Sequence, residues 1–129
     1  MPNYKELRYN YRKDIKKGTC YCILSGLQIN DPNQLSLEHF VPLCKGPYYE
    51  SRQWYNIFPA FKIINSIKGG RLPCDWYEYR KPLLQHALRK GNLRKKDAEI
   101  VKAALENVEN YKINPCEYCI LSRGCRDCR

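Results

Sequence analysis

Four polar residues near the middle of the chain have side chains suited to the hydrolysis of a phosphodiester bond. Glu38 and His39 are neighbours in an otherwise apolar run, and Asn56 and Asn65 follow them. A carboxylate and an amide oxygen suit Mg²⁺ or Mn²⁺, and a neutral imidazole can take a proton from water. These residue types predict that Glu38 and Asn65 bind one divalent cation while His39 acts as the general base.

A strand and a helix are expected to position these groups. The β-prone run over residues 35–41 predicts a strand that ends at Pro42. From Ile57 to Ile67 the apolar residues recur with the period of a helix, and two glycines follow. Because neighbouring side chains of a strand point to opposite faces, Glu38 and His39 can border one site only where the strand ends and bends.

The segments around this core are expected to be mostly helical. Short strands are predicted over 20–24, 27–29 and 53–55. Helices are predicted over 4–17, over 76–91 and from an N-cap near Asn92 to Tyr111. The fold class is therefore α+β. We expect one domain over residues 1–129, with a motif core at about 20–71, a helical extension over 75–112 and a cysteine-rich tail over 115–129.

The spacing of the polar residues resembles the HNH nuclease motif. The motif reads Glu38-His39-x-x-Pro42, then Asn56, then Asn65-x-x-Lys68-Gly69, and the segment 22–27 resembles the hairpin that often precedes it. The resemblance implies a ββα-metal core, a β-hairpin and a helix around one divalent cation. It covers about residues 20–71.

The resemblance also implies a role for each residue. Glu38 would be the first metal ligand, His39 the general base, Asn56 the residue that orients His39 by hydrogen bonding, and Asn65 the second ligand. Two features depart from the family. Glu38 stands where Asp or His is usual, and the helix lacks the Cys-x-x-Cys that often binds a structural zinc, so apolar packing is expected to replace that zinc.

The charge of the chain favours a polyanionic partner. With 23 Lys and Arg against 13 Asp and Glu, the formal net charge is +10, which suits DNA, with RNA as the alternative. No apolar run reaches the roughly 18 residues of a membrane-spanning helix, so no membrane association is expected. The location is expected to be cytoplasmic, for a protein encoded by a bacterium or a phage. The basic residues expected to contact phosphates are Lys45, Arg52, Lys62, Lys68 and Arg71.

Two Cys-x-x-Cys pairs close the chain. Cys116, Cys119, Cys125 and Cys128 are expected to bind a structural Zn²⁺ in a compact knuckle. Disulfides or an iron–sulfur cluster are the alternatives, and Cys20 with Cys22 could instead join one tail pair. Cys44 and Cys74 are expected to be buried as small hydrophobic residues.

The sequence therefore predicts a metal-dependent HNH endonuclease that hydrolyses DNA, with products that, by resemblance, carry 5′-phosphate and 3′-hydroxyl ends. The alternative from another class is a non-catalytic, zinc-stapled nucleic-acid-binding module on a degenerate HNH scaffold, which the glutamate at position 38 favours. A third is an adaptor in a larger complex that docks through its cysteine tail.

Overall fold

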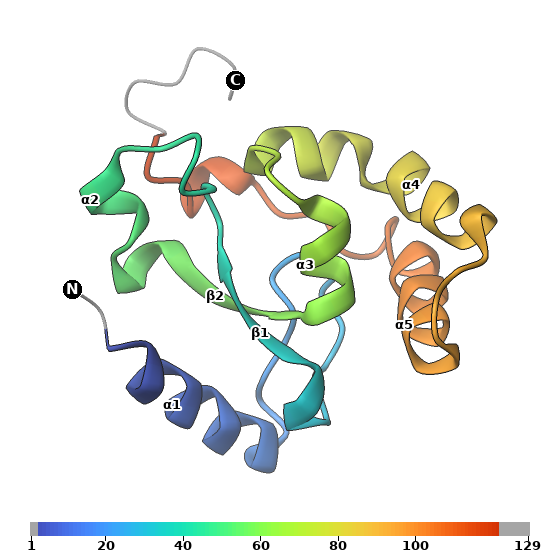
Figure 1. Ribbon diagram of the computed structural model, residues 1–129, viewed down its shortest axis with the longest axis horizontal. Coiled ribbons are helices and arrows are strands. Elements are labelled where there is room, and N and C mark those ends of the chain that lie inside the picture. The colour runs from blue at the N-terminus through green and yellow to red at the C-terminus, as the bar shows by residue number, and fades with distance from the viewer. Residues whose placement is uncertain (1–2, 122–129) are drawn as a thin grey trace.

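The computed structural model describes residues 3–121 and has an α+β architecture (Figure 1). Two antiparallel strands form a sheet, and helices lie on both sides of it. The elements in chain order are α1 (Tyr4–Lys17), β1 (Leu35–His39), α2 (Tyr48–Ser51), β2 (Ile57–Phe61), α3 (Lys62–Lys68), α4 (Pro73–Lys90) and α5 (Lys95–Glu106), with short 3₁₀ turns η1 (Pro32–Gln34), η2 (Trp54–Asn56) and η3 (Pro115–Glu117).

Helix α1 has the bounds predicted from the sequence. The Asn3 side chain accepts a hydrogen bond from the Glu6 N–H and caps its first turn. Gly18 ends the helix with φ 74°, a left-handed conformation that favours glycine. Figure 1 shows α1 on the opposite side of the hairpin from α3, α4 and α5.

The hairpin differs from the predicted one. The segment 20–29 contains only an isolated bridge between Tyr21 and Gln28, and residues 54–56 form a 3₁₀ turn rather than a strand. The strand that pairs with β1 is β2, over residues expected to begin the helix. The helical period misled because Ile57, Ala60 and Phe61 are buried in β2 and Ile64 continues the buried set in α3.

Pro59 shows how a proline is accommodated in β2. It pairs with Leu37 of β1, and its carbonyl accepts a hydrogen bond from the Ile23 N–H at 3.0 Å. Proline has no N–H to donate but keeps its acceptor, so it fits a two-stranded sheet of edge strands. The segment around Ile23 therefore lies along β2 without forming a regular third strand.

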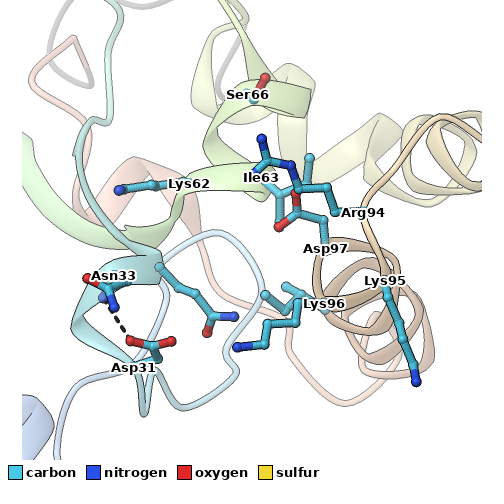
Figure 2. A pocket seen from close by; sticks show the side chains of 11 residues that line it. Asp31, Asn33, Lys62, Ile63, Ser66, Arg94, Lys95, Lys96 and Asp97 are labelled. Atoms are coloured by element: carbon cyan, nitrogen blue, oxygen red, sulfur yellow. Dashed lines mark hydrogen bonds between the residues drawn. The ribbon is translucent and has the colours of Figure 1, made fainter.

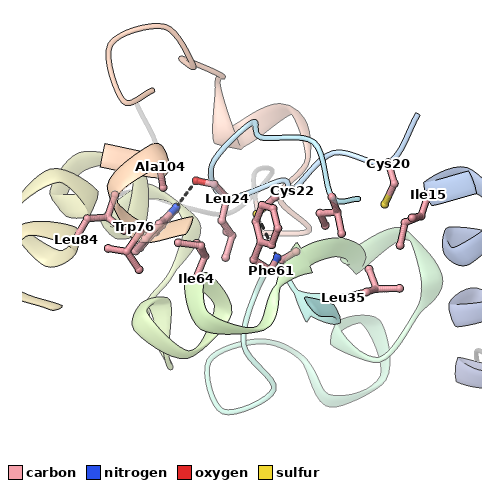
Figure 3. Close-up of a cluster of buried hydrophobic side chains, with 13 residues drawn as sticks. Ile15, Cys20, Cys22, Leu24, Leu35, Phe61, Ile64, Trp76, Leu84 and Ala104 are labelled. Atoms are coloured by element: carbon pink, nitrogen blue, oxygen red, sulfur yellow. Dashed lines mark hydrogen bonds between the residues drawn. The ribbon is translucent and has the colours of Figure 1, made fainter. Parts of the chain in front are cut away.

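The main core joins the two ends of the molecule (Figure 3). Ile15 of α1 and Leu35 of β1 lie at one end, and Leu84 of α4 and Ala104 of α5 lie at the other. Trp76 of α4 is fully buried and donates its indole N–H to the Leu24 carbonyl at 3.0 Å. Apolar packing thus fixes α3 against the hairpin, since Ile64 is also fully buried in this core.

The last helix is shorter than predicted. It ends at Glu106, although the apolar pattern continues to Tyr111. The following segment is held by side chains instead: Arg80 donates to the carbonyls of Val108 and Tyr111, and the Tyr111 hydroxyl donates to the Ile23 carbonyl at 2.7 Å. No helix among residues 3–121 is both long and apolar enough to cross a membrane.

Candidate functional site

Strand β1 and helix α3 bring two of the predicted residues to one interface. The Asn65 amide nitrogen lies 3.1 Å from the Ser36 hydroxyl, and the Lys68 ammonium lies 3.2 Å from Glu38 Oε1. Ser36 and Glu38 are two residues apart on β1, so they share a face of the strand. Asn65 and Lys68 are three apart on α3, so they share a face of the helix. Glu38 and Asn65 therefore both face the β1–α3 interface.

The Glu38 carboxylate is deeply buried and only half satisfied. It is 2% exposed, and its Oε1 is paired with the fully buried Lys68. Its Oε2 is buried without a hydrogen-bond partner. Burial raises the pKa of Glu38 to about 7 against the opposing effect of Lys68, which shows that the present positive charge does not fully offset desolvation. An orphaned carboxylate oxygen of this kind fits a hard cation.

Asn65 has an oxygen atom of the kind that a divalent cation takes as a ligand. Its amide nitrogen is used by Ser36, so the carbonyl oxygen is the atom available to a metal. Oxygen is the ligand type that Mg²⁺ and Mn²⁺ take. The residues at this interface thus fit a divalent cation in their chemistry, with Lys68 as a resident positive charge beside them.

His39 lies at the end of β1, on the other face from Glu38. It is the last residue of the strand, and the chain bends at Phe40 and Val41. Its Nε2 lies 3.5 Å from the Tyr4 hydroxyl of α1, and the two rings meet edge-on. It borders a cavity of about 600 Å³ between α1 and β1, named here the α1 groove.

The surroundings of His39 keep its imidazole neutral. Burial lowers its pKa from 6.5, and the positive charges of Arg52 and Lys68 lower it further. A neutral imidazole can accept a proton at pH 7. The ammonium of Lys68 that is bonded to Glu38 therefore also acts on the pKa of His39.

Asn56 fixes the bend after His39 rather than bonding to the imidazole. Its Oδ1 accepts from the Val41 N–H at 2.9 Å, and its Nδ2 donates to the carbonyls of Val41 and Ser51 at 2.9 and 2.8 Å. Its own carbonyl accepts from the Phe40 N–H at 2.8 Å. Asn56 therefore does not make the expected hydrogen bond to His39, because both of its amide protons are donated to backbone carbonyls. It acts on His39 only through the backbone of Phe40 and Val41.

The basic residues expected to contact phosphate fall into different environments. Lys45 and Lys62 are exposed, and Arg52 is half-buried near His39. Arg71 is exposed, but its guanidinium caps α3 by donating to the carbonyls of Ile67 and Lys68. Lys68 departs from the prediction: it is fully buried and paired with Glu38, so it is not part of the surface.

Two of the four cysteines expected to bind zinc lie outside the described residues. Cys125 and Cys128 are outside residues 3–121, while Cys116 is half-buried and Cys119 is buried beside Phe40 and Val41. Within the described residues no three His, Cys, Asp or Glu side chains gather as a metal-binding group.

The other cysteines occupy contrasting places. Cys20 and Cys22 are buried in the main core, and Cys22 Sγ accepts from the Phe61 N–H at 3.4 Å. The predicted burial of Cys44 and Cys74 is wrong: Cys44 is exposed and Cys74 is half-buried, because the segment around Cys44 is a surface turn. The alternative in which Cys20 and Cys22 share a metal with the tail stays a prediction.

A second cavity, of about 640 Å³, lies between α3 and the start of α5 (Figure 2). Lys62, Arg94, Lys95 and Lys96 contribute positive charge to its lining. Asp31 and Asp97 add carboxylates from two of its sides, as Figure 2 shows. The mixed charge distinguishes it from the α1 groove, whose described lining residues include no acidic side chain.

The sequence interpretation missed part of the surroundings of His39. Tyr4, Arg8 and Arg12 line the α1 groove, although α1 itself was predicted. Their spacing of four residues was a usable signal, because it places them on one face of a helix. Their closeness to His39 could not be predicted from the sequence, since it depends on how α1 packs against the hairpin.

Comparison of the chain with models of protein families, with curated proteins and with solved structures found no match.

Proposed function

We propose that the protein is a metal-dependent endonuclease of the HNH type that hydrolyses phosphodiester bonds in DNA. One observation carries the proposal: Glu38 and Asn65 face a common β1–α3 interface, and His39 lies at the adjoining end of β1. The side chains proposed as metal ligands and as base thus come from one strand and the helix packed against it. The net charge of +10 supports a polyanionic substrate.

Glu38 and Asn65 would hold the divalent cation, Mg²⁺ or Mn²⁺. When bound, the ion supplies positive charge to the scissile phosphate and to the leaving oxygen. The unpartnered Oε2 of Glu38 supports this assignment, because a buried carboxylate oxygen without a donor needs a counter-charge. Lys68 keeps the carboxylate in place beside α3.

His39 takes a proton from the attacking water through a ring nitrogen. The water oxygen bonds to phosphorus as the bond from phosphorus to the leaving sugar oxygen breaks, and that oxygen takes a proton from solvent water. Resemblance to the family implies 5′-phosphate and 3′-hydroxyl products. The lowered pKa of His39 keeps the base unprotonated at neutral pH. Asn56 holds Phe40 and Val41, and so fixes the backbone that carries the imidazole.

Basic side chains near the site would bind phosphates on either side of the scissile one. Lys45, Arg52 and Lys62 are the main candidates, and Arg71 would combine this role with its cap of α3. Such contacts set the position of the strand without reading its sequence. Structural Zn²⁺ in the cysteine tail belongs to the same proposal.

The test is cleavage of supercoiled plasmid in Mg²⁺ or Mn²⁺ by His39→Ala and by a matched control. Loss of the base is expected to slow nicking at least about 100-fold. The control is His86→Ala, which removes an exposed histidine of α4 and is expected to nick at the parental rate. If His39→Ala cleaves as fast as the parent, the assignment of the base is wrong.

A non-catalytic nucleic-acid-binding module is the second candidate, and one observation favours it. Lys68 already pairs with the carboxylate that would bind the cation. If Lys68 keeps this place, the scaffold binds DNA without cleaving it. The parental protein would then show salt-dependent binding and no cleavage at any concentration of Mg²⁺ or Mn²⁺.

A further inference from the structure

The α1 groove has two walls of different origin. Tyr4, Arg8 and Arg12 come from α1, and His39 comes from the end of β1. Lys62, the first residue of α3, also borders it. A helix at the start of the chain thus faces the candidate base across an open cavity of about 600 Å³.

The cations of α1 form a row that leads to His39. Tyr4, Arg8 and Arg12 are successive fourth residues, so they stand above one another on the helix, about 6 Å apart along its axis. Tyr4 is the member that touches the His39 ring, at 3.5 Å. Arg8 and Arg12 therefore follow Tyr4 along the helix in one direction from the base.

Within residues 3–121, Arg8, Arg12 and Lys62 take part in no ion pair. The ion pairs between described residues join Lys68 with Glu38 and Lys112 with Glu109, and neither involves Arg8, Arg12 or Lys62. All three side chains are exposed. Because no Asp or Glu of the described chain lines the groove, its positive potential is not cancelled locally.

The second cavity is a weaker candidate for the same ligand. It has four cations, but the carboxylates of Asp31 and Asp97 lie among them (Figure 2). Nearby carboxylates repel phosphate. The α1 groove also borders His39, whereas the second cavity does not.

We infer that the α1 groove binds the backbone of the DNA strand that is cut. Arg8 and Arg12 contact phosphates next to the one that faces His39, and Lys62 contacts the strand from the opposite wall. This inference rests on the proposed function, and it adds α1, a helix outside the HNH-like segment, to the substrate site. In this inference Arg8 and Arg12 are substrate-binding residues, since they contact neighbouring phosphates and not the reacting atoms.

The test compares Arg8→Gln/Arg12→Gln with a control that removes the same charge elsewhere. The control is Lys81→Gln/Lys102→Gln, two exposed residues of α4 and α5. Binding of a short DNA duplex of mixed sequence is measured by fluorescence anisotropy over a range of salt concentrations. Cleavage under multiple-turnover conditions gives kcat and KM for each variant.

The Kd of the arginine variant for DNA is expected to be at least tenfold higher than that of the parent. The slope of log K against log salt should become less steep by about two, close to 0.9 for each lost phosphate contact. The KM of the arginine variant rises while kcat stays within a few-fold of the parent. The control changes Kd by less than about threefold. Arg8→Lys/Arg12→Lys keeps the charge and is expected to restore most of the salt slope.

The outcomes separate this inference from the proposed function. If the parent cleaves DNA and the arginine variant matches the control in Kd, slope and KM, the groove is not the strand site, although the nuclease proposal stands. If the parent binds DNA through Arg8 and Arg12 but never cleaves it, the groove is a DNA-binding site and the nuclease proposal is wrong. Absence of DNA binding by the parent at low salt overturns both.

Discussion

On one face of β1, Glu38 is 2% exposed and lies against the fully buried Lys68. On the other face, His39 borders an open groove whose far wall is α1. The two residues are neighbours in the chain, yet one is enclosed between strand and helix and the other lies beside solvent. A strand sends successive side chains to opposite sides, so a sequence pair such as Glu-His marks two environments.

The proposed function assigns a different task to each face. A carboxylate that binds a cation benefits from a low-dielectric site, where the attraction is strong. A base that takes a proton from water needs access to water and to substrate. The charge of Lys68 acts on both residues, since it is paired with Glu38 and lowers the pKa of His39.

Removal of the lysine on the enclosed face is expected to have the largest effect on stability. Lys68→Met leaves the Glu38 carboxylate buried and unpaired, which should cost about 3–5 kcal/mol of unfolding free energy at pH 8. The cost should be smaller at pH 5, where Glu38 can take up a proton. Urea denaturation at the two pH values measures it.

The matched control is Lys62→Met on the same helix, where the side chain is exposed and the change should stay within about 0.5 kcal/mol. Glu38→Leu/Lys68→Met should recover much of the lost stability, because no charge is left buried. Equal stabilities of Lys68→Met and Lys62→Met would show that the two faces do not differ as described.

The pH dependence of stability is expected to show the next largest effect. Glu38 has a pKa of about 7 in the folded protein against an ordinary value of 4.5, so the folded state holds more protons between these values. Its contribution to stability is therefore complete below about pH 4.5 and is lost as the pH rises through about 7. The loss is at most about 3 kcal/mol.

Lys68 is the charged group that faces Glu38, and Glu38→Gln keeps it while removing the titration. Thermal unfolding followed from pH 4.5 to pH 8 should therefore show a fall in the parent that Glu38→Gln lacks. A parent and a variant with parallel pH profiles would contradict the raised pKa.

Tyr4→Phe, on the open face, is expected to have the smallest effect. It removes the hydroxyl that lies 3.5 Å from His39 Nε2 and keeps the ring contact. A single hydrogen bond of this length contributes no more than about 1 kcal/mol, so nicking should slow by less than about fivefold. Unfolding free energy should hardly change, and a loss comparable to that of His39→Ala would give Tyr4 a chemical role.

The sequence predicted the parts of the fold that local chemistry decides. The bounds of α1 follow from the Asn3 cap and Gly18, and α4 follows from a helical apolar pattern that ends at Gly91. The partner of β1 was not predictable in this way. Residues 57, 60 and 61 are buried with the i, i+3, i+4 spacing of a helix, and this segment is a strand because it pairs with residues 35–39.

The candidate site was predictable in its residue types and less so in its contacts. Glu38 and Asn65 both face the β1–α3 interface, where Asn65 contacts Ser36, whereas His39 lies on the other face at the end of the strand. Two contacts depended on tertiary packing. Asn56 bonds to the backbone of Val41 and Ser51, and Lys68 turns inward to Glu38. Neither partner could be chosen from sequence, because a lysine and an asparagine are both usually found on the surface.

Helix α3 begins at Lys62, directly after β2 ends at Phe61, with no connecting residue. One residue inserted at this junction would rotate the rest of α3 by about 100°. Asn65 and Lys68 would then turn away from Glu38. The exposed turn around Leu43 and Lys45 carries no such constraint. Over evolutionary time, length variation should therefore accumulate in that turn and be excluded from the strand–helix junction.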